Sequence, residues 1–261
     1  MKQSASPTFV SVEAIEDAAE LFRKAKRAVV LTGAGISTPS GIPDFRSEGS
    51  GLWSNDEPME VASLSAFRTS PERFFNWFRP LADRIFNAKP NAAHRALAEL
   101  ENTAPELTVV TQNIDGLHQK AGSKRVVEMH GTLRTLSCTE CFKQVESQQF
   151  LQSYIEDGKI PRCLICNGIL KPDVILFGEQ LPLSAWLEAQ RAARQCDLML
   201  VAGSSLEVLP VAGLPMQAID RGAHLIVVNN TPTYVNVRAD VVITGDVASI
   251  IPEIAKRVLH G

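Results

Sequence analysis

A chain of 261 residues is long enough to bury a full hydrophobic core, and it suits one large α/β domain or a domain with a small insert. Its content of 45% hydrophobic and 21% charged residues is that of an ordinary soluble protein. The net charge of −3 offers no basic footprint for a polyanion, so we expect no specific nucleic-acid partner. No apolar run is long enough to span a bilayer, so we expect no membrane partner either.

The cysteine pattern and the first residues predict a compartment. The opening ten residues carry one lysine and no apolar segment, which argues against a secretory signal or a transit peptide. Four of the five cysteines form two closely spaced pairs, a spacing that favours metal binding over disulfides. We therefore expect a cytoplasmic location.

A glycine-rich segment follows the first expected helix (12–26) and the first expected strand (28–31). Gly33 and Gly35 let the backbone turn tightly, approach a ligand and offer free N–H groups to phosphate oxygens. Thr38 stands where the third glycine of a dinucleotide fingerprint would be, so these two glycines alone equally fit a surface turn. The whole stretch to Arg46 predicts a phosphate-binding loop followed by a mobile cover.

The next segment, 62–86, is dense in Phe and Trp, has helical spacing and contains a helix start at Pro71. At helical spacing, these aromatic residues predict core or a pocket wall, not nucleic-acid stacking. A further short helix is expected over 91–100, with Asn91 as its cap.

Short apolar segments then alternate with helical ones, which predicts an α/β fold with a parallel sheet wound by crossovers. The expected strands cover 108–111, 126–129, 174–177, 198–202, 225–228 and 241–243. Several of them end in small or polar residues, and ligands of such sheets bind at the carboxyl ends of strands.

The two pairs Cys138-x-x-Cys141 and Cys163-x-x-Cys166 predict one structural zinc site. Each pair can present two thiolates from a tight turn, and four sulfurs leave no open position for chemistry. Redox pairs or unrelated thiols are the alternatives. Cys196 approaches a buried strand and is expected to be a small core residue.

His130 closes an expected strand, where a histidine near neutral pKa can act as a general base. Gln112, Asn113 and Asp115 follow a neighbouring strand and offer polar groups to a ligand, although Asn-x-Asp-Gly is also a good turn. The other histidines are expected to be structural, with His118 undecided because it could cap a turn; they are His94, His118, His224 and His260.

Taken in order, these residues resemble the sirtuins, the NAD-dependent protein lysine deacylases. The matching motifs are Gly-Ala-Gly-Ile-Ser with Ser-Gly-Ile-Pro-Asp-Phe-Arg, Thr-Gln-Asn-Ile-Asp-Gly-Leu-His, His-Gly, the two Cys pairs, Pro-Asp-Val to Phe-Gly-Glu and Gly-Ser-Ser-Leu. They span about residues 25 to 250 in the expected order. The two long motifs are highly specific.

The resemblance implies one sirtuin-type domain over 1–261, of the bacterial type. Its Rossmann-like part would comprise 25–50, 90–131 and 171–255, with a zinc-ribbon module at 132–170 and a helical pocket segment at 51–89. NAD, the co-substrate, and an acyl-lysine peptide would enter the cleft between the large and small parts.

The resemblance also assigns catalytic and binding roles to individual residues. His130 would be the base that activates a ribose hydroxyl, and Asn113 would orient the ribose or a water. Residues expected to bind NAD are Gly33, Ala34, Gly35, Thr38, Asp44, Phe45, Arg46, Gln112, Asn113, Ile114, Asp115, His130, Gly203, Ser204, Ser205, Asn229, Asn230, Asp246 and Val247. Those expected to hold the peptide as an added strand are Val174, Phe177, Gly178, Glu179, Glu207, Val208 and Leu209.

The reaction implied is removal of an acyl group from protein lysine, giving free lysine, nicotinamide and O-acyl-ADP-ribose. Sirtuins that prefer succinyl or malonyl lysine carry Tyr-x-x-Arg where this chain has Phe78 and Leu81, which favours acetyl or longer apolar acyl groups, although Arg79 and Arg84 lie nearby. The alternatives are a mono-ADP-ribosyltransferase or NAD glycohydrolase using the same site. A zinc-ribbon module that binds nucleic acid fits the acidic charge balance poorly.

Overall fold

The computed structural model describes residues 11–44, 57–103 and 106–261. Six strands form one sheet, all paired in parallel, in the order β3-β2-β1-β7-β8-β9. Their bounds are β1 Arg27–Thr32, β2 Glu106–Thr111, β3 Val126–Glu128, β7 Leu198–Ala202, β8 His224–Asn229 and β9 Val241–Thr244. This is the strand order of the classic dinucleotide-binding fold, so the predicted Rossmann-like class is confirmed.

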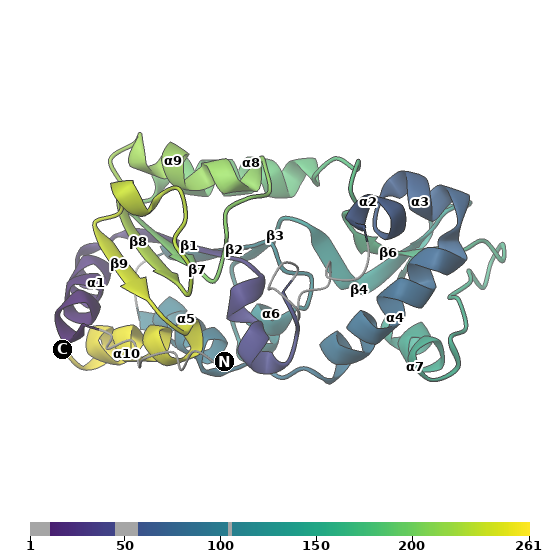
Figure 1. Ribbon diagram of the computed structural model, residues 1–261, viewed down its shortest axis with the longest axis horizontal. Helices are drawn as coiled ribbons and strands as arrows, with labels where there is room; N and C mark the ends of the chain where they lie inside the picture. The colour runs from purple at the N-terminus through teal and green to yellow at the C-terminus, as the bar shows by residue number, and fades with distance from the viewer. Residues whose placement is uncertain (1–10, 45–56, 104–105) are drawn as a thin grey trace, which may run out of the picture.

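Helices cover both faces of this sheet (Figure 1). One face carries α1 (Val12–Lys24), α5 (Ala92–Thr103) and α10 (Val247–His260), and the other carries α8 (Leu183–Gln195) and α9 (Leu214–Ile219). Within β1, Val30 packs into the first of these cores, whereas Val29 and Leu31 pack into the second. Because side chains of a strand alternate between faces, a strand buried on both faces needs a continuous apolar run, which residues 28–31 of β1 provide.

A smaller part lies beside the sheet, at the right of Figure 1. It contains a three-stranded antiparallel sheet in the order β5-β4-β6, from β4 (Gly131–Cys138), β5 (Gln144–Glu146) and β6 (Leu170–Val174). The remaining α-helices of the described residues are α2 (Pro58–Val61), α3 (Leu64–Thr69), α4 (Pro71–Asn87), α6 (Leu117–Ala121) and α7 (Gln148–Asp157).

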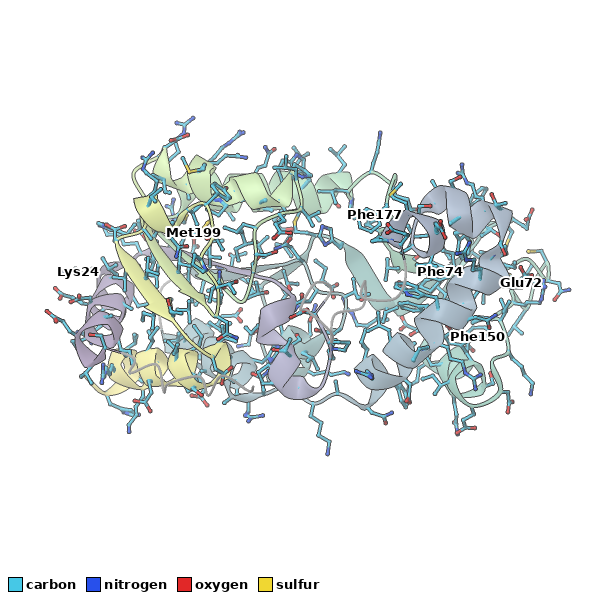
Figure 2. All side chains as sticks on the ribbon, in the orientation of Figure 1. Lys24, Glu72, Phe74, Phe150, Phe177 and Met199 are labelled. Carbon is cyan, nitrogen blue, oxygen red and sulfur yellow. The ribbon has the colours of Figure 1, made fainter. Side chains whose placement is uncertain are left out.

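The aromatic segment forms the core of this smaller part. The rings of Phe67, Phe74 and Phe75 lie 5.2–5.9 Å apart in edge-to-face geometry, and all three residues are buried. Figure 2 shows Phe74 in this part and Met199 within the large sheet. The prediction of a core or pocket wall is therefore confirmed, because edge-to-face rings are a normal core arrangement.

The prediction of a parallel strand over 174–177 is wrong. β6 ends at Val174 and pairs antiparallel with β4 in the small sheet. Val174 and Leu176 pack into the aromatic core, so their apolar character comes from contact with α4 and not from a place in the large sheet. A short apolar run does not by itself reveal which of these environments buries it.

Candidate active site

The loop after β1 and the loop after β7 touch through their backbones. Gly35 N donates to Gly203 O at 2.8 Å, and Gly33 N donates to Ala202 O at 3.4 Å. A Cβ on Gly35 would lie 2.8 Å from Gly203 O, closer than real Cβ contacts. The glycines thus allow the two loops to pack, and their N–H groups are used within the protein instead of being free for phosphate as the sequence predicted.

We expect Gly203→Ala to open this loop contact. Gly203 has a φ of +62°, and an added Cβ would lie 2.4 Å from Ile36 N. The backbone strain and the clash together should lower the free energy of unfolding by about 2 kcal/mol or more. NAD affinity should fall at least about tenfold, because a change of 1.4 kcal/mol in binding free energy already gives that factor.

Thermal unfolding and calorimetric titration with NAD measure both effects. Gly213→Ala is the matched control, because an added Cβ there meets no atom within 4 Å and its φ is −83°. Equal melting temperatures and NAD affinities for the two variants would contradict the role of Gly203 in packing the two loops.

Asn113, two residues after the end of β2, is held by two hydrogen bonds from its side-chain amide. Its Nδ2 donates to Gly33 O at 3.0 Å and to Ser37 Oγ at 3.1 Å. Ser37 Oγ in turn donates to Asp115 Oδ2 at 2.7 Å. Burial raises the pKa of the Asp115 carboxyl, and hydrogen bonds from Leu117 N and Ser37 oppose that shift. Ser37 was given no role from the sequence, although it stands inside the first matching motif.

His118 and His94 form a buried pair beneath these strand ends. Their ring centroids are 4.8 Å apart, and His118 Nε2 lies 3.0 Å from Thr32 Oγ1. Burial lowers the pKa of His118 to about 3 and that of His94 to about 4, so both rings are neutral near pH 7. The structural role predicted for His94 agrees with this burial, and His118 packs inside the fold.

His130 is oriented by a backbone carbonyl. Its Nδ1 lies 3.0 Å from Gln112 O, and a carbonyl oxygen can only accept, so Nδ1 carries the proton. The neutral ring then keeps a lone pair on Nε2. Burial, the larger influence, lowers the pKa of His130, while the bond to Gln112 O raises it. His130 also lines the cavity between the large sheet and the smaller part, so this neutral imidazole fits a general base.

A cavity of about 860 Å³ is lined by residues of both the large sheet and the smaller part. This volume is usual for a ligand site. From the predicted NAD set, its wall includes Gly33, Ala34, Gly35, Thr38, Asp44, Gln112, Asn113, Ile114, Asp115, His130, Gly203, Ser204, Ser205, Asn229, Asn230 and Val247. From the predicted peptide set, it includes Val174, Phe177, Gly178, Glu179, Glu207, Val208 and Leu209. Phe45 and Arg46 lie outside the described residues.

Two residues of the predicted NAD set, Asp246 and Asn229, use their side chains within the protein. Asp246 does not line the cavity: its carboxylate accepts from Ala248 N and Ser249 Oγ and so caps α10. Asn229 lines the cavity, but its amide accepts from Ser204 N at 3.0 Å and donates to Ser204 O at 2.8 Å. The Asn229 side chain therefore fixes the loop after β7.

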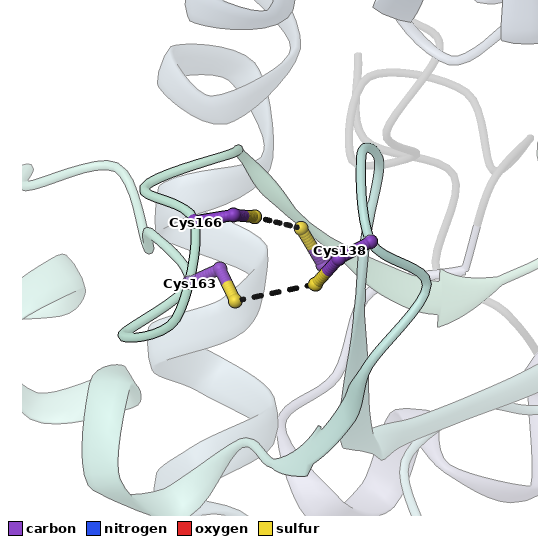
Figure 3. A group of neighbouring side chains, drawn as sticks. Cys138, Cys163 and Cys166 are labelled. Atoms are coloured by element: carbon purple, nitrogen blue, oxygen red, sulfur yellow. Dashed lines mark hydrogen bonds between the residues drawn. The ribbon is translucent and has the colours of Figure 1, made fainter.

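The four paired cysteines meet as predicted. Sulfur atoms from two turns face each other (Figure 3), with Cys138 Sγ 3.4 Å from Cys166 Sγ and Cys141 Sγ 3.7 Å from Cys163 Sγ. All four Sγ atoms lie within 4.8 Å of one another. Zinc with Zn–S bonds of about 2.3 Å needs sulfurs about 3.8 Å apart in a tetrahedron, so this set fits the ion. Four sulfur ligands complete its coordination, so the zinc is structural.

The fold and cavity define a dinucleotide-binding α/β protein with a metal-binding module. The family model described as the Sir2 family matches residues 33–210, and the chain belongs to this family. It is 46% identical over 245 residues to the NAD-dependent protein deacylase 2 of Archaeoglobus fulgidus, covering 94% of this chain and 96% of the relative.

Two solved structures extend the comparison. One comes from work on the mechanism and regulation of Sir2 enzymes; it is 45% identical, has a TM-score of 0.89 and covers 95% of this chain and 99% of its own. The other is Sir2Af2 bound to a myristoylated histone peptide, 40% identical, with a TM-score of 0.81 and coverage of 95% and 97%.

Proposed function

We infer that this protein is an NAD-dependent protein lysine deacylase. It removes acetyl or other apolar acyl groups from lysine side chains and gives free lysine, nicotinamide and O-acyl-ADP-ribose. The observation that carries this conclusion is His130: its neutral ring lines the cavity with Nδ1–H donated to Gln112 O and Nε2 left as a base. Family membership and the deacylase and deacetylase names of relatives support the same reaction.

Each part of the site has a task. NAD would supply a ribose carbon that bonds to the acyl oxygen as nicotinamide leaves, and a ribose hydroxyl that then takes the acyl carbon from the lysine nitrogen. One water is consumed overall, which balances the products free lysine, nicotinamide and O-acyl-ADP-ribose. His130 Nε2 takes the proton from that hydroxyl, a step that needs the unprotonated imidazole. Asn113, fixed by Gly33 O and Ser37 Oγ, orients the ribose or a water. The apolar wall around the acyl group keeps bulk water away.

The direct test is mass spectrometry of one reaction that contains the protein, NAD and a peptide with a single acetyl-lysine. Equal amounts of deacetylated peptide, nicotinamide and O-acetyl-ADP-ribose are the expected result. Nicotinamide release without deacetylation would instead indicate ADP-ribosyl transfer or NAD hydrolysis at the same site.

The part of the cavity lined by α4 is apolar, and we expect it to disfavour charged acyl groups. Phe74, Phe78, Leu81 and Ile85 of α4 line the cavity. Arg79 donates to Ile155 O and Glu156 O instead. A buried carboxylate without a partner costs several kcal/mol, so kcat/KM for a succinyl-lysine peptide should be at least about a hundredfold below that for an acetyl-lysine peptide.

A 4-methylpentanoyl-lysine peptide is the matched control, since it has the branching of succinyl without the charge. We expect steady-state kinetics to show turnover of this peptide and of the acetyl peptide. Comparable turnover of the succinyl peptide would mean that a cation reaches the pocket, and the apolar assignment would be wrong.

The peptide is proposed to bind as an added strand between 174–179 and 207–209, two segments that both contribute to the lining of the cavity. A cytoplasmic location belongs to the same proposal, because four thiols that bind zinc must stay reduced. Among the described residues, no helix combines the length and apolar character needed to cross a bilayer.

A further inference from the structure

Lys171 connects the metal-binding module to the peptide side of the cavity. It stands in β6 beside Leu170, and in the pairing with β4 these two residues lie opposite Ser137 and Cys138. The Lys171 side chain is only 16% exposed. Its Nζ lies 3.0 Å from Glu179 Oε2, 2.8 Å from Val174 O and 3.3 Å from Pro172 O. The three N–H donors of the ammonium group thus have three acceptors.

Glu179 closes the loop that borders the cavity. Its Oε2 accepts from Leu176 N at 2.7 Å, and its own N–H donates to Leu176 O at 3.0 Å. Gly178, between them, has a φ of +84°, which favours glycine. The carboxylate of Glu179 is 20% exposed and therefore depends on a nearby cation for compensation.

The same loop is anchored on its other side. Phe177 N donates to Ala62 O, and Leu64 N donates to Phe177 O, each at 2.9 Å. The loop over 176–179 is thus held by the segment around α3 on one side and by Glu179 on the other. Only the second anchor depends on a charge pair that a substitution can remove.

We propose that Lys171 is a positioning residue for the substrate peptide, acting through Glu179. It neutralises the Glu179 carboxylate, which keeps the Leu176 N–H bonded and holds the loop in the shape that receives the peptide strand. Without Lys171, a half-buried carboxylate would face the carbonyl oxygens of Pro172 and Val174, and Glu179 would turn toward water. This inference rests on the proposed deacylase function, which gives the loop a peptide to hold.

A substitution of Lys171 should affect peptide binding and leave NAD binding unchanged. Lys171 contacts the peptide side of the cavity, whereas the NAD side is built from the loops after β1, β2, β7 and β8. Lys171→Met should therefore raise the KM and the dissociation constant of an acetyl-lysine peptide about tenfold, with the KM for NAD unchanged within about twofold. Lys171→Arg keeps the charge and should recover part of the loss.

A double-mutant cycle with Glu179→Gln tests whether Lys171 acts through Glu179. The glutamine keeps an oxygen for Leu176 N but removes the charge that needs Lys171. In the Glu179→Gln background, Lys171→Met should raise the peptide dissociation constant by less than about threefold. This double variant leaves no unpaired charge, so it also provides the comparison if Lys171→Met alone does not fold.

Fluorescence anisotropy of labelled acetyl-lysine peptide, together with steady-state kinetics, measures these constants. Additive effects in the cycle, an unchanged peptide dissociation constant or an equal rise in both KM values would each overturn the proposal. These results differ from failure of the proposed function, in which the wild-type protein itself releases no free lysine.

Discussion

Replacement of His130 by alanine is expected to lower kcat for deacylation about a thousandfold, within the range that general-base catalysis contributes. Its Nε2 is the group that takes the proton of the accepting ribose hydroxyl, and alanine leaves no base in that place. Peptide and NAD affinities should change little, since the loss falls on a step after binding. Quantification of O-acetyl-ADP-ribose and free lysine by mass spectrometry measures the effect.

His224→Ala is the matched control. His224 is exposed at the start of β8, where its Nδ1 lies 3.0 Å from Asp240 Oδ1, and it does not line the cavity. Its activity should stay within about twofold of wild type, as for most surface substitutions. Retention of more than about a tenth of the activity by His130→Ala would remove His130 from the general-base role.

The pH dependence follows from the protonation state of His130. Only the neutral ring can accept a proton, so kcat/KM should rise with pH through the His130 pKa and then level off. Burial holds this pKa below the usual value of 6.5. The acid limb should therefore have its midpoint below pH 6.5, and Gln112 O limits how far the midpoint falls. A midpoint above 7 would contradict a buried neutral histidine.

The sequence located the reacting groups because their chemistry is local. The ability to take a proton, to bind a metal or to form hydrogen bonds belongs to the side chain itself. The sequence therefore shows it for a histidine at a strand end, for two close cysteine pairs and for amides after a strand. Nearly every residue that the family motifs predicted lines one cavity in the described part of the chain. Such motifs name a residue but not the partner of each of its atoms.

Three predicted site residues illustrate that limit. The N–H of Gly35 is used by Gly203, 168 positions away in the chain, and the Asp246 carboxylate is used by its own helix. Glu179 lines the cavity and stays a predicted peptide-binding residue, and its carboxylate is bonded to Leu176 N and Lys171. Each outcome depends on long-range packing or on a choice among nearby donors, which residue type alone does not decide.

The parallel strand predicted over 174–177 failed for a related reason. Burial against α4 and burial within a sheet select the same apolar residues. The pairing of β6 with β4 is antiparallel and places the segment in the small sheet. Local composition therefore indicated that the segment is buried, while the tertiary contacts decided where.

Loss of the zinc site is expected to disable the enzyme although the metal takes no part in the reaction. The buried apolar cluster around the site consists of Leu136, Cys138, Cys163 and Leu170. A core of four residues is too small to hold β4, β5 and the two cysteine turns without the ion. Because β6 also carries Lys171, disorder there should reach the loop over 176–179.

The double variant Cys163→Ser, Cys166→Ser should bind less than about a tenth of an equivalent of zinc and lose at least about 99% of its activity, since structural zinc sites supply folding free energy directly. Wild-type protein should carry one equivalent by elemental analysis. Cys196→Ala is the control, because this buried cysteine lies outside the cluster. If the serine variant kept full activity without zinc, the module would fold unaided and the small cluster would suffice. If it kept its zinc, these cysteines would not be the ligands.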